Sequence, residues 1–266
     1  MNVFHQLHLL KRKIERRLAP KSSFHKYQYL LPFKKTYPKV YSIEKTINDL
    51  LHSNKSISRF GDGEFHLCLG QSINFQSFSP SLQKRLKEVL NSSNQECEIA
   101  IIEYVIEGMT PYTQEFWYEN ISFITKLFKK KQYHNARISR QLTQEQFLKL
   151  KVIWQNRDVI FITGKGSRFD TNHELFDNIK AHTAIYGKAE NAWDNYDELL
   201  NEVISVSKSI EEPIVICSLG PTATVLAYDL STKHQIRTLD LGHLTNVYDM
   251  IFYGKQRPED INYNTK

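Results

Sequence analysis

The sequence has few cysteines and no long apolar run. Its 266 residues include three cysteines, an odd number, and Cys68, Cys97 and Cys217 form no CxxC pair. This pattern predicts reduced thiols in a cytoplasmic protein, each a small core residue. No apolar stretch approaches the 18 residues of a membrane-spanning helix, and the first residues lack the apolar segment and cleavage site of a secretory signal.

Several common catalytic signatures are also absent. The chain contains neither the GxxxxGK[ST] of a P-loop nor a GxGxxG, which disfavours an ATPase or an NAD-dependent enzyme. No Ser-His-Asp set can be recognised, and Cys217 lies inside an apolar run, so nucleophilic acyl transfer has little support. Without internal repeats or a domain-length linker, the length fits a single large α/β domain.

Excess positive charge is confined to one end of the chain. Residues 1–40 hold ten of the 35 basic residues but one of the 29 acidic residues, so residues 41–266 are slightly acidic although the net charge is +6. A nucleic-acid-binding domain would be expected to carry a basic face in its body as well. We therefore expect no nucleic-acid partner.

Residues 1–40 are predicted to form a basic amphipathic extension. Apolar residues recur at three- and four-residue steps from Val3 to Leu18, basic residues flank them, and Pro20 ends the pattern. The favoured interpretation is a helix that packs on its own body or on a second subunit as a homodimer. The alternative is peripheral contact with an anionic membrane or a partner.

Beyond residue 40, predicted strands and helices alternate. Apolar strands alternating with helices imply an α/β, Rossmann-like fold over residues 41–266, with a mostly parallel sheet and helices on both faces. Strands are expected at 56–60, 97–105, 136–139, 158–164, 182–187, 213–220 and 235–243, and helices near 42–51, 79–90, 114–128, 144–154, 193–207, 223–231 and after 243.

Four of these strands are followed by glycine and polar residues. In open parallel sheets, ligands bind beyond the carboxyl ends of the strands. The four segments are Gly61–Glu64, Gly164–Asp170, Leu219–Thr224 and Leu241–His243. No one of them is specific, but their agreement predicts a ligand site at this edge of the sheet.

Asp62 and Glu64 are the candidate metal ligands. In an extended segment, side chains two residues apart point to one side, and Gly63 between them adds no side chain. Carboxylate oxygens on one side suit Mg²⁺ or Mn²⁺. The alternative is an acidic turn with solvated carboxylates.

The segment after the 158–164 strand has the composition of a phosphate-binding turn. Gly164 and Gly166 would let the backbone approach closely, and Ser167 and Arg168 could meet phosphate oxygens. An ordinary glycine turn is the alternative.

Two further strand exits offer polar groups. Gly220 opens a helix in which Thr222 could cap the first turn or contact an anion. His243 could be a third metal ligand, a phosphate donor or a base, and the alternative is a purely structural histidine.

The segments "SRFGDGEF", "ITGKGSRFD", "GKAENAWDNYDEL", "SLGPTATVLAYDL" and "LDLGHL" occur in this order. Together they resemble the bacterial glycosyltransferases of the GT-D fold, first catalogued as DUF1792, over roughly residues 40–255. The resemblance implies a Rossmann-like domain with a metal-binding DxE motif at Asp62 and Glu64. It also implies transfer of a hexose from a UDP-sugar, with UDP-glucose as the first donor to test, to a glycan acceptor in glycoprotein or surface polysaccharide glycosylation.

In this interpretation the nucleotide lies at the same edge of the sheet. Arg59, Ser167 and Arg168 are expected to meet phosphate or ribose, and Thr163 and Gly164 to line the crevice. Tyr186 could stack on the uracil, although a core tyrosine is the commoner alternative.

Transfer with inversion also needs a general base for the acceptor hydroxyl. Glu103, after the 97–105 strand, and Asp249, after His243, are the candidates. Two other functions stay open: a metal-dependent phosphohydrolase acting on a nucleotide or sugar phosphate, and a non-catalytic nucleotide-sugar-binding protein.

Overall fold

The computed structural model describes residues 23–256 and has one eight-stranded sheet at its centre. The strand order is β1-β4-β3-β2-β8-β7-β5-β6, and all neighbouring strands run parallel. The strands are β1 (Lys39–Val40), β2 (Ser56–Phe60), β3 (Cys97–Ile101), β4 (Gln132–Asn135), β5 (Asp158–Gly164), β6 (Ala181–Gly187), β7 (Ile214–Ser218) and β8 (Thr238–Asp240). The predicted α/β, Rossmann-like fold is confirmed, whereas the helix predicted before Pro20 lies outside the described residues.

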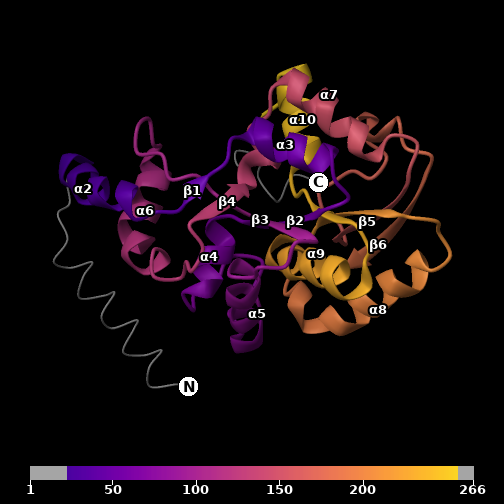
Figure 1. The fold of residues 1–266 in the computed structure, drawn as a ribbon, viewed down its shortest axis with the longest axis horizontal. Coiled ribbons are helices and arrows are strands. Elements are labelled where there is room, and N and C mark those ends of the chain that lie inside the picture. The colour runs from indigo at the N-terminus through magenta and orange to yellow at the C-terminus, as the bar shows by residue number, and fades with distance from the viewer. Residues whose placement is uncertain (1–22, 257–266) are drawn as a thin grey trace.

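Helices cover both faces of the sheet (Figure 1). One face carries α4 (Asp62–Cys68), α5 (Pro80–Leu90), α6 (Pro111–Ile124), α8 (Tyr196–Ser207) and α9 (Gly220–His234), and α2 (Ser23–Leu30) packs on α6. The other face carries α3 (Ile43–Leu51), α7 (Gln144–Lys151) and α10 (Leu244–Tyr253). Short 3₁₀ helices are η1 (Leu31–Lys35), η2 (Ala136–Ser139), η3 (Val152–Trp154), η4 (Glu174–Phe176) and η5 (Ala192–Asn195).

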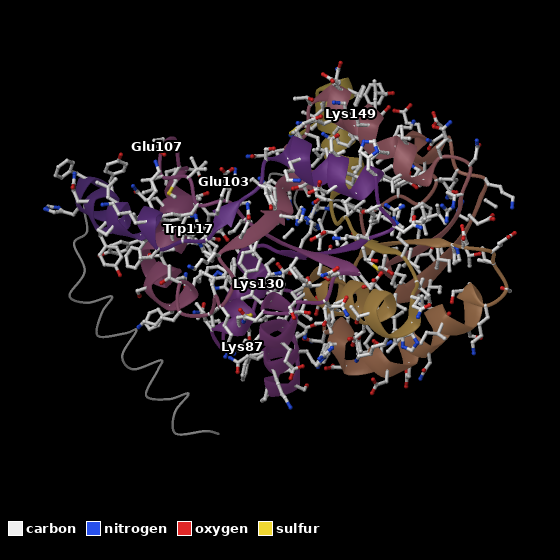
Figure 2. The ribbon with its side chains drawn as sticks, viewed as in Figure 1. Lys87, Glu103, Glu107, Trp117, Lys130 and Lys149 are labelled. Carbon is white, nitrogen blue, oxygen red and sulfur yellow. The ribbon has the colours of Figure 1, made fainter. Side chains whose placement is uncertain are left out.

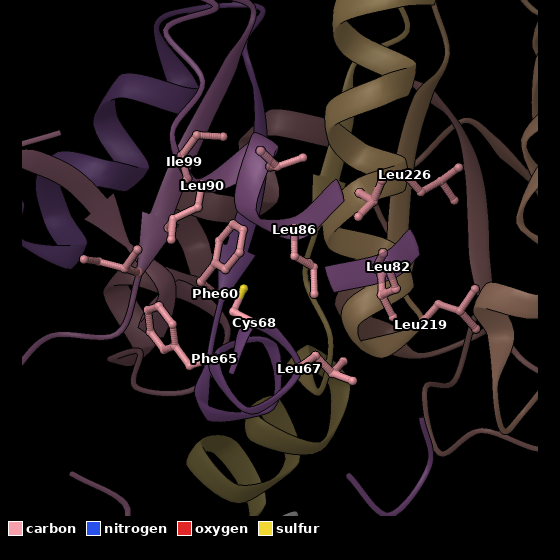
Figure 3. Close-up of a cluster of buried hydrophobic side chains, with 14 of the residues drawn as sticks. Phe60, Phe65, Leu67, Cys68, Leu82, Leu86, Leu90, Ile99, Leu219 and Leu226 are labelled. Atoms are coloured by element: carbon pink, nitrogen blue, oxygen red, sulfur yellow. The ribbon is translucent and has the colours of Figure 1, made fainter. Parts of the chain in front are cut away.

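The strands bury both of their faces, which explains why they read as continuous apolar runs. Along β5, Ile160 and Ile162 join the core under α4, α5 and α9, while Val159 and Phe161 join the opposite core. Figure 3 shows the first core, in which side chains of α4, α5 and α9 meet the sheet. All three cysteines are free and buried, as the sequence predicted.

Several predicted boundaries were wrong. Residues 136–139 form η2 instead of a strand, because the Asn135 side chain accepts the N–H of Arg137 and turns the chain directly after β4. The strand expected at 97–105 ends at Ile101. The strand expected at 235–243 begins only at Thr238, because Gln235 adopts a left-handed conformation that ends α9.

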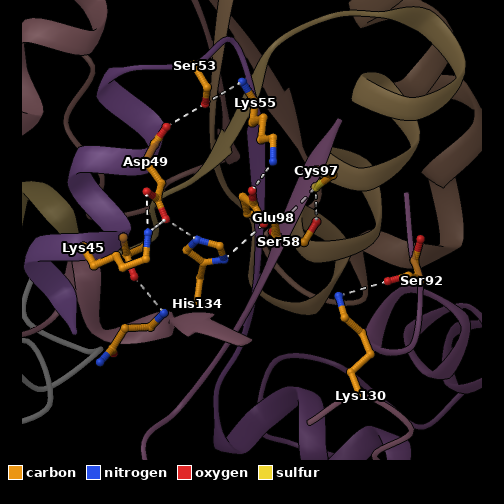
Figure 4. A network of polar contacts seen from close by, with 12 residues as sticks. Lys45, Asp49, Ser53, Lys55, Ser58, Ser92, Cys97, Glu98, Lys130 and His134 are labelled. Carbon is orange, nitrogen blue, oxygen red and sulfur yellow. Dashed lines mark hydrogen bonds and ion pairs between the residues drawn. The ribbon is translucent and has the colours of Figure 1, made fainter. Parts of the chain in front are cut away.

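A charged network joins α3 to β3 and β4 (Figure 4). The ring of His134 lies between Asp49, 2.9 Å from Nε2, and Glu98, 3.1 Å from Nδ1. Lys45 pairs with Asp49, and Lys55 pairs with Glu98. Although burial alone would raise the pKa of Glu98, hydrogen bonds from His134 and Lys55 lower it to about 2. Both carboxylates in this network therefore have cationic or hydrogen-bonding partners.

Candidate active site

The four glycine-containing segments lie at one continuous edge of the sheet. The strands that precede them, β2, β8, β7 and β5, are consecutive in the sheet order. Because all of these strands are parallel, their carboxyl ends meet at the same edge. The structure thus brings the predicted segments together.

Asp62 and Glu64 lie in the first turn of α4, not in the extended segment expected from the sequence. Gly61 is the N-cap in an extended conformation, and its N–H donates to Oε2 of Glu64 at 2.7 Å. This bond closes the helix start, since it satisfies an N–H that has no partner within the helix. The expected extended segment was therefore wrong, but the bond to Gly61 turns the Glu64 carboxylate back to the helix start, where the charge of Asp62 acts on it.

Glu64 carries an uncompensated negative charge. It is partly buried, and desolvation, followed by the nearby carboxylates of Asp240 and Asp62, raises its pKa to about 7. None of the ion pairs in the described part of the chain includes Glu64. A cation placed beside this group would remove the penalty of ionising it.

The carboxylates can contribute to a metal site but cannot complete one. Residues 23–256 contain no group of three or more His, Cys, Asp or Glu side chains arranged to hold a metal ion. Mg²⁺ is commonly held by one or two carboxylates with water and substrate phosphates as the remaining ligands. Asp62 and Glu64 could supply the two carboxylates of such a site.

Tyr112 reaches Asp62 from α6. Its hydroxyl donates to Oδ2 of Asp62 at 3.0 Å, although 68% of the tyrosine is exposed. Desolvation and the Asp62 carboxylate raise the pKa of Tyr112 to about 12, so the hydroxyl remains a donor at neutral pH. No local pattern in the sequence marks Tyr112, because its partner lies 50 residues away.

Arg59 binds the protein itself. Its Nη2 pairs with Oδ1 of Asp240 at 3.0 Å, and its Nη1 donates to the carbonyl of Ala136 and, at 2.6 Å, to Oγ of Ser139. The side chain is 13% exposed. The sequence predicted that Arg59 would face phosphate, but the structure shows it tying β2 to β8 and η2. Asp240, which the sequence analysis missed as a site residue, is its main partner.

His243 lies among arginines. It occupies the position before α10 with a φ of 67°. Burial, and then the charges of Arg140, Arg59 and Arg168, lower its pKa to about 3, which leaves the ring neutral at physiological pH. Such surroundings favour an anion, such as a phosphate, over a metal cation. Arg140 is a further residue that no sequence pattern indicated.

Two buried hydroxyls accompany the phosphate-type turn. Thr163 at the end of β5 and Thr222 in the first turn of α9 are each at most 1% exposed, and their hydroxyls have no hydrogen-bond partner among the described residues. Ser167, in contrast to the two threonines, is hydrogen-bonded within the turn. Its N–H donates to the carbonyl of Gly164, and its Oγ accepts the N–H of Phe169. Gly166 adopts a φ of 75°, which favours glycine.

Loops from two distant parts of the chain meet over the start of α9. Gly220 has a φ of 53°, and a Cβ there would lie 2.6 Å from the ring of Phe75, so glycine is required. Asn191 binds the same loop twice, since its N–H donates to the carbonyl of Phe75 and its Oδ1 accepts the N–H of Ser77.

The remaining predicted residues are more peripheral. Tyr186 on the edge strand β6 is 57% exposed, so the alternative of a core tyrosine was wrong. Glu103 lies two residues beyond the end of β3 and is partly buried. Asp249 on α10 forms an ion pair with Lys255, in which Oδ2 lies 2.9 Å from Nζ. Its other oxygen, Oδ1, lies 3.3 Å from Nε2 of His173.

A parallel Rossmann-like sheet carries carboxylates, arginines and buried hydroxyls at one edge, which is where ligands bind in sheets of this kind. The family model described as glycosyltransferase GT-D fold matches residues 57–264, and the chain belongs to this family. Its fold is therefore that of the GT-D glycosyltransferases.

Solved structures and named relatives agree with this assignment. A glycosyltransferase (DUF1792) from Streptococcus sanguinis is 29% identical, with a TM-score of 0.74 over 82% of this chain and 85% of that one. A structure described as domain of unknown function 1792 with a distinct glycosyltransferase fold is 27% identical, with a TM-score of 0.75 over 88% of this chain and 86% of that one.

The named relatives are longer proteins. The probable glycosyl transferase Gly of Streptococcus gordonii is 29% identical over 81% of this chain, and glycosyltransferase GlyD of Streptococcus pneumoniae serotype 4 (strain ATCC BAA-334 / TIGR4) is 27% identical over 81%. The matched regions cover 33% and 28% of these proteins, so the chain spans about a third of their length.

None of the described helices is both long and apolar enough to cross a membrane.

Proposed function

We propose that the protein is a metal-dependent hexosyltransferase that uses a UDP-sugar, with UDP-glucose as the first donor to test. The observation that carries the proposal is Glu64, a partly buried carboxylate with a pKa raised to about 7 and no cationic partner in the described residues, next to Asp62 and Asp240. His243 lies at the same edge among arginines. Negative and positive groups side by side suit a metal-bound diphosphate.

Each group has a distinct task in this proposal. Asp62 and Glu64 hold Mn²⁺ or Mg²⁺, which when bound stabilises the charge that develops on the leaving diphosphate. Arg168 and the hydroxyl of Ser167 bind phosphate oxygens, and neutral His243 adds a hydrogen bond rather than a metal–ligand bond.

The nucleoside would lie against β5 and α9. The hydroxyls of Thr163 and Thr222, which have no partner in the described residues, supply hydrogen bonds at the base of the crevice. Gly164 and Gly220 allow close approach, and Tyr186 is exposed enough to stack on the uracil.

Glu103 is the better candidate for the general base. Both carboxylate oxygens of Asp249 already have partners, since Lys255 donates to Oδ2 and Nε2 of His173 lies 3.3 Å from Oδ1. Glu103 follows β3, the strand next to β2, and its loop precedes the helix that carries Tyr112.

The acceptor is proposed to be a glycan on a glycoprotein or surface polysaccharide, and the protein to act in the cytoplasm. The helix predicted before Pro20 is proposed to contact a membrane or a second subunit, whereas residues 23–40, predicted as part of the same extension, pack on the domain through α2 and β1. These parts of the proposal are independent of the metal site.

The test is donor turnover in the full chain. UDP release from UDP-glucose in the presence of Mn²⁺ and a glycan acceptor should be lost in EDTA and in Asp62→Asn. A thermal-shift comparison of UDP, GDP, CMP and ADP with Mn²⁺ should show the largest shift with UDP. Stabilisation by ADP alone would contradict the proposal, and sugar or phosphate release at one rate with and without acceptor would indicate a phosphohydrolase. UDP binding without turnover would indicate a non-catalytic sensor.

A further inference from the structure

The hydrogen bond from Tyr112 to Asp62 parallels the bond that orients Glu64. Oε2 of Glu64 accepts the N–H of Gly61 at 2.7 Å, and Oδ2 of Asp62 accepts the hydroxyl of Tyr112 at 3.0 Å. Carboxylates that bind metals are usually oriented by such an outer hydrogen bond. For Glu64 the donor is fixed by α4 itself, but for Asp62 it comes from a different helix.

Burial does not fix the Tyr112 side chain, because 68% of the residue is exposed. Its position must follow from the position of α6, which begins at Pro111 with Thr110 as its cap. Among the described elements, α2 is the one that packs most extensively against α6. The N-terminal segment therefore helps to set where the first turn of α6 lies, together with the core side chains of α6.

We call residues 23–37 the brace. The hydroxyl of Tyr104, just before α6, donates to the carbonyl of Leu30 at 2.8 Å, and Lys34 pairs with Glu107 at 2.8 Å. Trp117 on α6 packs edge-on against the Tyr104 ring. Figure 2 shows Glu103, Glu107 and Trp117 on the same side of the molecule as α2, away from α8 and α10.

Two further contacts extend the brace along α6. Tyr37 donates to the carbonyl of Ile102 at 2.7 Å, directly after β3, and Lys26 pairs with Glu115 on α6. The brace thus holds the connection between β3 and α6 as well as the second turn of α6.

We propose that Tyr112 is a positioning residue for Asp62, and that the brace holds Tyr112 in place. The hydroxyl fixes the orientation of the Asp62 carboxylate toward the ion, so the brace acts on metal binding without touching the metal. This inference rests on the proposed metal-dependent transfer. It gives residues 23–37, which precede the matched family region, a role in the site.

The first test measures Mn²⁺ binding to the full chain in the presence of UDP, from the electron paramagnetic resonance signal of free Mn²⁺. Tyr112→Phe keeps the ring and removes the hydroxyl, and should weaken Mn²⁺ binding about tenfold with an unchanged melting temperature. Tyr253→Phe is the matched control, because Tyr253 is also exposed and its hydroxyl also donates to a carboxylate, that of Glu174. It should bind Mn²⁺ like the wild type.

The outcomes separate this inference from the proposed function. Normal Mn²⁺ binding in Tyr112→Phe together with its loss in Asp62→Asn would overturn the positioning role alone. Absence of Mn²⁺ binding in the wild type would overturn the proposed function and this inference with it.

The second test addresses the brace through a double-mutant cycle. Tyr104→Phe should weaken Mn²⁺ binding several-fold in the wild-type background and have no further effect in Tyr112→Phe. Lys34→Ala removes an exposed ion pair, and it should weaken Mn²⁺ binding less, again only when Tyr112 is present. This second variant keeps the test valid if Tyr104→Phe folds poorly. Equal effects in both backgrounds, or none in either, would overturn the role of the brace.

Discussion

Glu64 and Glu98 are both partly buried glutamates, but their pKa values move in opposite directions. Burial and neighbouring carboxylates raise the pKa of Glu64 to about 7. Burial acts in the same sense on Glu98, yet hydrogen bonds from His134 and Lys55 outweigh it and lower the pKa to about 2. One glutamate lies at the ligand-binding edge of the sheet and the other in a closed network with α3 (Figure 4).

The difference separates a carboxylate with its partners in place from one that we propose binds a cation. The network around Glu98 is electrostatically complete and needs no ligand. Glu64 lacks a counter-charge in the described protein, so its ionisation costs stability until a cation arrives.

The largest expected effect is on catalysis. Glu64→Gln and Asp62→Asn should each lower kcat by about 10³-fold, because they remove charge that balances the ion and the leaving diphosphate. Glu98→Gln should keep at least most of the wild-type rate at a temperature where it is folded. UDP release measures all three, and full activity of either site variant would break the contrast.

Glu98→Gln should have the largest effect on stability. Removing one partner of a buried charged network destabilises by about 3 kcal/mol at pH 7. Because the folded pKa of Glu98, about 2, is below its ordinary value of 4.5, its contribution is present above pH 4.5 and is lost as the pH falls toward 2. Urea denaturation at pH 7 and pH 3 should therefore show a difference from wild type that shrinks at the lower pH.

Glu64→Gln should instead stabilise the metal-free protein above neutral pH. The folded pKa of about 7 exceeds the ordinary 4.5, so the wild-type stability contributed by this group is present below pH 4.5 and is lost as the pH rises through 7. Relative to wild type in EDTA, the variant should gain on the order of 2 kcal/mol at pH 8 and almost nothing at pH 4.5. A variant that is less stable at pH 8 would show that Glu64 has a counter-charge after all.

The smallest effect concerns ligand stabilisation. Mn²⁺ with UDP at tenfold excess over Kd should stabilise the wild type by about 1.4 kcal/mol. The increase in melting temperature should persist in Glu98→Gln and disappear in Glu64→Gln. An equal increase in Glu64→Gln would place the ion elsewhere.

The sheet could be predicted because its strands are buried on both faces and read as apolar runs. Helix α4 could not be predicted, because the Asp-Gly-Glu sequence is typical of a turn. Its N-cap, Gly61, has no capping side chain that would mark a helix start in the sequence. The hydrogen bond from Gly61 to Glu64 closes its first turn and sets the direction of the Glu64 carboxylate.

The site could be located from the sequence, but its internal pairing could not. The parallel sheet fixes which segments meet, so four strand exits were sufficient to find the edge. The bonds from Arg59 to Asp240 and from Tyr112 to Asp62 join residues 181 and 50 positions apart, and no local periodicity encodes them. For the same reason Arg59 was assigned to phosphate when it binds the protein.

The contacts of Asn191 have a consequence for how a ligand enters. Asn191 joins the loop after β6 to the loop that carries Phe75 and Ser77, through one backbone and one side-chain hydrogen bond. Neither loop can move without the other while both bonds persist, so the two should open as one cooperative unit. Entry would then follow a single opening rate, and the amide hydrogens of Ser77 and Asn191 would exchange with solvent in step.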